Sequence, residues 1–158
     1  MQNWYFPGDP DRVESLKAAS LTGAIAGLVG AVILLAHRGV SLGWVAALGS
    51  VTGGFSGGTF WVSVAIATVS GSLFGVTYRY AVRQDHNLQI QAGVILAFSV
   101  VRGLALVNVA AALELSGWPF LAAGLESLLL FALSGGALEW AMGRKWVGRV
   151  KGGRSFEC

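Results

Sequence analysis

The sequence predicts an all-α protein, a polytopic membrane helix bundle of about five helices in which the second helix is short. Two observations carry this prediction. Of the 158 residues, 54% are hydrophobic and only 12% are charged, which is about half the charged share of an average soluble domain. In addition, long uncharged runs recur along the chain, and each is long enough to cross a bilayer as a helix.

The first helix is predicted to begin in water near residue 10 and to run into the membrane. Asp9 suits the N-cap, and Pro10 suits the first helical position. The uncharged run 18–36 that follows is roughly 28 Å long as a helix, which is about the thickness of one hydrocarbon core. We expect this helix to end at His37 and the two residues after it.

The chain carries no charged residue from Gly39 to Tyr78. As one helix this run would be roughly 60 Å long, about twice the thickness of a hydrocarbon core, so the chain must turn. The glycine-rich segment TGGFSGG (52–58) is the expected turn. It divides the run into a short helix over about 41–53 and a full span over about 59–78. We expect the short helix to cross the membrane, and the alternative is that it re-enters and leaves on the same side.

Two more spans follow a polar loop that begins at Arg79. One helix over about 88–113 carries Arg102, and a turn at 114–119 leads into a fifth helix over about 118–142. The tail is basic, and we expect it to be loosely ordered on the membrane surface. The chain thus divides into a polar N-terminal segment (1–17), a transmembrane bundle (18–142) and a basic C-terminal tail (143–158).

The distribution of lysine and arginine predicts the orientation of the bundle. With five crossings, one side holds Arg38, Arg79, Arg83 and the basic tail, and the other side holds only Arg12 and Lys17. If the short helix re-enters, the N-terminus joins the basic side. In both arrangements the positive-inside rule places the C-terminus and the loop after the third helix on the cytoplasmic face.

Arg102 and Glu126 are the only ionisable residues placed well inside the predicted spans. A charge near the bilayer centre costs roughly 3 kcal/mol or more unless it is paired or hydrated. Measured from the turn at Ser116, Arg102 lies roughly 21 Å deep, Glu126 roughly 15 Å and Asn108 roughly 12 Å. We therefore expect these three side chains to form one polar cluster between antiparallel helices. Its first interpretation is a structural ion pair, and the alternatives are a substrate or proton path and a ligand site.

Small residues recur at four-residue spacing along the predicted helices, a pattern that lets membrane helices approach closely. We expect them to pack helices within the monomer, with docking of a partner or a second copy as the alternative. The glycines concerned are Gly23, Gly27, Gly49, Gly53, Gly57, Gly71 and Gly75.

Several expectations come from what the sequence lacks. Neither His37 nor His86 is placed inside a predicted span, so a histidine-ligated cofactor in the bilayer is not expected. The sequence contains no metalloprotease, nucleotide-binding or nucleophile motif. We therefore expect no enzymatic activity, no cofactor, no metal and no nucleic acid. The expected partners are the lipid bilayer and either another membrane protein complex or a second copy of the chain.

The run LFGVTYRYAVRQDHN (73–87), followed by LAFSVVRGLALVN (96–108), resembles a family of small polytopic membrane proteins without assigned function from cyanobacteria and plant plastids. The resemblance covers the middle part of the chain. It implies a bacterial plasma or thylakoid membrane and a photosynthetic lineage. The expected function is therefore a structural or assembly factor of an energy-converting photosynthetic membrane. The alternative is a small transporter or channel built around Arg102 and Glu126, which requires a hydrated cavity that reaches them.

Overall fold

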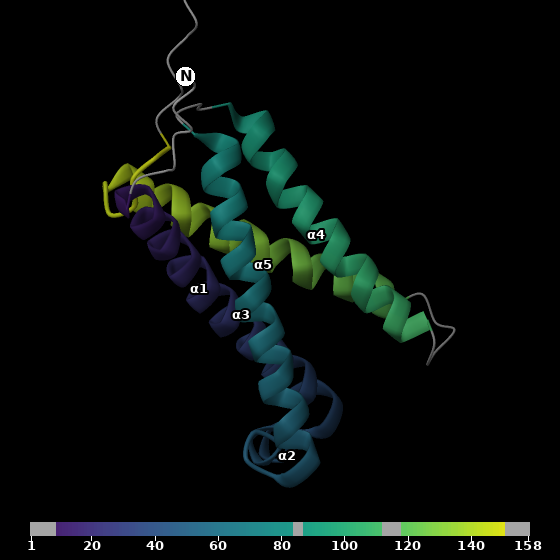
Figure 1. The fold of residues 1–158 in the computed structure, drawn as a ribbon. Coiled ribbons are helices and arrows are strands. Elements are labelled where there is room, and N and C mark those ends of the chain that lie inside the picture. The colour runs from purple at the N-terminus through teal and green to yellow at the C-terminus, as the bar shows by residue number, and fades with distance from the viewer. Residues whose placement is uncertain (1–8, 84–86, 112–117, 151–158) are drawn as a thin grey trace, which may run out of the picture.

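The computed structural model describes residues 9–83, 87–111 and 118–150, and over these residues the chain is helical (Figure 1). Four of its helices are long and apolar enough to span a membrane, so the chain is a multi-pass membrane protein. The helices are α1 (Asp9–Leu42), α2 (Trp44–Gly49), α3 (Gly54–Val82), α4 (Leu88–Ala111) and α5 (Trp118–Gly143). Residues 1–8 of the expected polar segment, the centre of the turn predicted at 114–119, His86 and residues 151–158 of the tail lie outside the described residues.

Helix α1 is longer than predicted, because it does not end at His37. It continues to Leu42, and its 34 residues make a helix roughly 51 Å long. The helix stops at Gly43, whose φ of 86° belongs to the left-handed region that ends helices and favours glycine. A charged side chain interrupts hydrophobicity but not helical hydrogen bonding, so the polar residues after the apolar run extend the helix.

Helix α2 has only six residues, which corresponds to a length of roughly 9 Å. It is too short to cross a bilayer, so the predicted crossing is wrong and the chain turns back on the side where α1 ends. The predicted break in the uncharged run is confirmed, since the chain leaves helical structure between Gly49 and Gly54. The glycines at 57 and 58 lie inside α3, however, so this span begins earlier than predicted.

The four long helices form two antiparallel hairpins, α1–α3 and α4–α5 (Figure 1). One end of the bundle gathers the start of α1, the end of α3, the start of α4 and the end of α5. We call it the basic end, because Arg12, Lys17, Arg79, Arg83 and the segment 144–149 lie there. The opposite end, which holds α2, is called the α2 end. There the tips of the two hairpins lie far apart.

The two hairpins are joined by an aromatic contact in the core. Phe74 of α3, Phe98 of α4 and Phe131 of α5 pack against one another, with ring centroids 5.2 to 5.5 Å apart. Phe74 and Phe131 are buried. Ring pairs at this separation stabilise a core beyond the area they bury.

Four of the seven spaced glycines lie between α1 and α3. A Cβ atom on Gly71 would lie 2.3 Å from the Cβ of Ala26, and one on Gly75 would lie 2.8 Å from the carbonyl oxygen of Ala18. Gly23 and Gly27 face α3 in the same way. The other three, Gly49, Gly53 and Gly57, lie around the α2 turn and face no neighbouring long helix.

Candidate functional site

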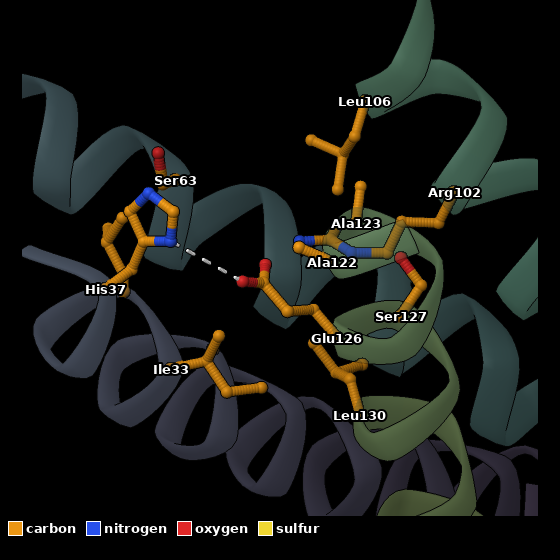
Figure 2. Close-up of a pocket in the computed structure, with 12 residues that line it drawn as sticks. Ile33, His37, Ser63, Arg102, Leu106, Ala122, Ala123, Glu126, Ser127 and Leu130 are labelled. Carbon is orange, nitrogen blue, oxygen red and sulfur yellow. Dashed lines mark ion pairs between the residues drawn. The ribbon is translucent and has the colours of Figure 1, made fainter. Parts of the chain in front are cut away.

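A cavity of about 300 Å³ lies between the two hairpins, in the half of the bundle nearer the α2 end (Figure 2). All four long helices contribute to its wall. Its polar side chains are His37 of α1, Ser63 of α3, Arg102 of α4, and Glu126 and Ser127 of α5. The remaining wall is apolar and comprises Gly30, Ile33, Leu34, Leu106, Ala122, Ala123 and Leu130.

The polar side chains of the cavity lie at least one turn inside the ends of their helices. Counted from the α2 end of each helix, Glu126 is roughly 12 Å and Arg102 roughly 14 Å along its axis. His37 lies roughly 8 Å from the end of α1. The His37 side chain is 66% exposed and that of Glu126 is 37% exposed, so the cavity is open rather than sealed.

Arg102 reaches across the cavity wall toward α3. Its Nη1 donates a hydrogen bond of 3.4 Å to Oγ of Ser70, and no other partner of Arg102 is found among the described residues. The contact is at the outer limit of hydrogen-bond length, so it satisfies little of the guanidinium. Arginine has five N–H donors and stays charged in proteins. Most of its donors are therefore available to a ligand or to water.

The carboxylate of Glu126 lies between the side chain of His37 and the guanidinium of Arg102 (Figure 2). Its Oε1 lies 4.0 Å from Nδ1 of His37, as the dashed line in Figure 2 marks. No ion pair of 4.0 Å or less joins Glu126 to Arg102 within the described part of the chain. Both side chains belong to the α4–α5 hairpin and line the same cavity, but Arg102 reaches Ser70 of α3 and Glu126 reaches His37 of α1.

Asn108, the third residue of the expected cluster, belongs to α4, but its side chain lies outside the described residues.

His37 lies in a helix that continues beyond the predicted end of the first span. It belongs to α1 because that helix continues to Leu42. The sequence contains a pattern that could have placed His37 on the cavity side of α1. Gly30, Ile33, Leu34 and His37 follow one another at helical spacing, so they share one face of α1, and all four line the cavity.

A second polar cluster, which the sequence did not predict, closes the basic end. Arg79 was expected in a loop, but it lies in α3 with its side chain only 1% exposed. It forms an ion pair with Asp11 and donates a hydrogen bond of 2.6 Å to Oγ of Ser15, both on α1. Its Nε donates to the carbonyl oxygen of Gly148 at 2.7 Å. One guanidinium thus joins α1, α3 and the segment after α5.

Two further contacts fix the segment after α5 to the bundle. The backbone N–H of Gly148 donates to Oε2 of Glu14 at 2.6 Å. Arg149 pairs with Glu139 at 2.7 Å, and the hydroxyl of Tyr78 donates to the same carboxylate at 3.2 Å. The first part of the tail is therefore packed against the bundle, which corrects the expectation of a loose tail for residues 144–149.

At the other end, Arg38 holds the α2 turn against α3. Its Nη1 donates to Oγ of Ser50 at 2.8 Å and to the carbonyl oxygen of Ser56 at 3.2 Å. Its Nη2 donates to Oγ1 of Thr59 at 3.2 Å, and its guanidinium lies 5.6 Å from the ring centroid of Phe60. The donors of Arg38 are therefore taken up by contacts within the protein, whereas most donors of Arg102 face a cavity.

The cavity offers groups of opposite charge together with hydroxyl groups. Among the described residues no three His, Cys, Asp or Glu side chains gather into a possible metal site. The donor set suits an organic ligand bound by ion pairs and hydrogen bonds. Comparison of the chain with family models, with curated proteins and with solved structures finds no match in any of the three.

Proposed function

We propose that this protein is a small, non-enzymatic membrane transporter that binds a polar solute in the cavity between its two helical hairpins. The observation that carries the proposal is that Arg102 and Glu126 line one cavity without pairing with each other. Charged side chains inside a span are expensive, and they commonly mark substrate or ion pathways. A structural ion pair would bring the two groups into contact, whereas a binding site leaves them free for a ligand.

One end of the bundle is closed and the other is open. A transporter that opens to one side of the membrane at a time has the same difference between its ends. The basic end is tied together by the buried Arg79 and its partners. The cavity lies toward the α2 end, where the hairpins diverge. Many transporters move by rocking one part of the bundle against another around a central site. In this protein the α1–α3 and α4–α5 hairpins are the two parts.

The orientation of the bundle follows from the same asymmetry. With four spans the first and last described residues lie at the basic end, where all the described lysines and arginines except Arg38 and Arg102 are found. The positive-inside rule supports a cytoplasmic basic end. The cavity then faces the periplasm or a lumen.

A thermal-shift screen of the detergent-purified chain against small charged metabolites tests the proposed function. At least one solute should raise the melting temperature of the wild type by mass action, and it should not raise that of Arg102→Gln. Arg83→Gln is the matched control, because Arg83 is exposed at the end of α3. If every solute acts equally on the wild type and on a folded Arg102→Gln variant, the cavity is not a solute site.

A structural or assembly role in a photosynthetic membrane stays a prediction, which rests on the resemblance of residues 73–87 and 96–108. It would be supported if the tagged protein, extracted from native membranes, carried a photosynthetic complex with it. Extraction of the protein alone in mild detergent would argue against that role.

A further inference from the structure

We propose that the solute is a small zwitterion, whose anionic group pairs with Arg102 and whose ammonium group pairs with Glu126. This inference rests on the proposed function and adds the chemical class of the ligand. It is carried by three features of the cavity: the balance of its charges, a hydroxyl group without a partner, and its size.

The charges of the cavity match a ligand with two opposite charges better than one with a single charge. An anion alone would satisfy Arg102 but would meet the carboxylate of Glu126, and a cation alone would meet the guanidinium. A cation leaves Arg102 without a charged partner, and an anion leaves Glu126 only its 4.0 Å contact with His37; a poorly paired charge discriminates against a ligand. A zwitterion pairs both groups, and it takes up the space that separates them.

The side chain of Ser127 supplies a second, independent indication of a ligand. Its Oγ is buried and has no hydrogen-bond partner among the described residues. Several other hydroxyl groups in these helices donate to the carbonyl four residues before them, as Ser63 does to Thr59 and Ser99 does to Ile95. Ser134 of α5, which does not line the cavity, also has a buried Oγ without a partner among the described residues. Ser127 lines the cavity beside Arg102 (Figure 2), and an anionic group that came within reach of its buried Oγ would accept its hydrogen bond.

The size and the walls of the cavity limit the ligand further. A volume of about 300 Å³ lies at the lower end of the range for small-molecule sites. Ile33, Leu34, Leu106 and Leu130 present apolar surface beside the charged groups. The ligand should therefore be of amino-acid size and carry an apolar part. A zwitterionic lipid head group has the same pair of charges and is the second source of this chemistry.

Matched probes separate a zwitterion from its singly charged parts. Binding of the standard amino acids to the purified full-length chain is measured by calorimetry. For each one that binds, the amine without the carboxyl group and the acid without the amino group are measured as well; for leucine these are 3-methylbutylamine and 4-methylpentanoate. We expect the zwitterion to bind at least about tenfold more tightly than either part, because each part leaves a charge unpaired.

A second experiment tests whether the ligand is a lipid head group. The protein is placed in nanodiscs of phosphatidylethanolamine or phosphatidylglycerol, and the lipid that stays bound is identified by native mass spectrometry. If the ligand is a head group, phosphatidylethanolamine should stay bound to the wild type and be lost from Glu126→Gln, while phosphatidylglycerol should not be retained. The proposal is overturned if no amino acid binds and neither lipid is retained, or if the acid binds as tightly as the zwitterion.

The variants distinguish failure of the ligand class from failure of the proposed function. Glu126→Gln should lose the preference for the zwitterion over the acid, and Arg102→Gln should lose both ligands; Arg83→Gln should match the wild type. If the carboxylic acid binds but the zwitterion does not, and Arg102→Gln abolishes binding of the acid, the cavity is a solute site but the solute is not a zwitterion. If binding of no probe depends on Arg102, both proposals fail.

Discussion

Arg79 of α3 and Asp11 of α1 form an ion pair at the basic end of the bundle, and the arginine side chain in it is only 1% exposed. The same guanidinium also donates to Ser15 and to the carbonyl oxygen of Gly148. The pair therefore joins the first half of the chain to its last described segment. The bundle depends on it, because these contacts link α1, α3 and the segment after α5.

Replacing Arg79 by leucine should destabilise the protein strongly. Removal of one partner of a fully buried pair costs about 3–5 kcal/mol, and the cost here should lie below that because the Asp11 side chain is 31% exposed and water can solvate it. Arg83→Leu changes an exposed arginine four residues further along and should have little effect. The melting temperatures of the two variants in detergent compare them directly. Equal melting temperatures would show that the Arg79 network does not hold the bundle together.

The packing of α1 against α3 predicts the effect of adding one methyl group to a glycine. Gly71→Ala should lower the melting temperature, because the new Cβ would lie 2.7 Å from the carbonyl oxygen of Thr22. Overpacking of this kind costs about 1–3 kcal/mol. Gly136→Ala on α5 is the matched control, since a Cβ there meets no atom within 4 Å. A Gly71→Ala variant as stable as the control would contradict the close approach of the two helices.

The contacts of Arg38 predict a local effect at the α2 turn. Arg38→Ala removes the donors that reach Ser50, Ser56 and Thr59. The segment between α1 and α3 should then be cut more rapidly by protease added from the α2 side of sealed vesicles. The same treatment of Arg102→Ala is the control and should give the wild-type rate. If protease cuts the turn at the same rate in both variants, the contacts of Arg38 do not stabilise the turn.

Four spans predict that both ends of the chain lie on the same, cytoplasmic side. Cys158 is the only cysteine, so a membrane-impermeant thiol reagent reports the position of the C-terminus. In inside-out vesicles we expect labelling of Cys158 and also of a cysteine added at the N-terminus. Labelling of the two from opposite sides would require an odd number of spans.

The sequence was most informative about the second hairpin. The predicted spans 88–113 and 118–142 nearly coincide with α4 and α5, because polar loop residues bound these apolar runs on both sides. The first hairpin was predicted less well. The lengths of α1 and α3 exceed their apolar runs, since polar residues at the membrane surface continue a helix without difficulty.

The sequence also placed Arg102 and Glu126 at similar depths, because the rise of a helix per residue is constant. It did not predict the direction of either side chain. That direction depends on Ser70 and His37 of the other hairpin, which approach the two side chains only in the folded chain. Burial of Arg79 escaped prediction for the same reason, since Asp11 and Gly148 approach it only in the folded chain.

Water access to the cavity is tested most directly by the reactivity of a cysteine placed at Ser63. In a chain with Cys158→Ser, the Ser63→Cys variant should react with a water-soluble, membrane-impermeant thiol reagent added from the α2 side. Leu129→Cys is the control, because Leu129 is exposed on α5 and does not line the cavity. A hydrated binding site predicts rapid reaction at residue 63 and slow reaction at residue 129, and addition of the bound solute should protect residue 63. Equal, slow reaction at both positions would contradict a hydrated cavity and, with it, the proposed transport function.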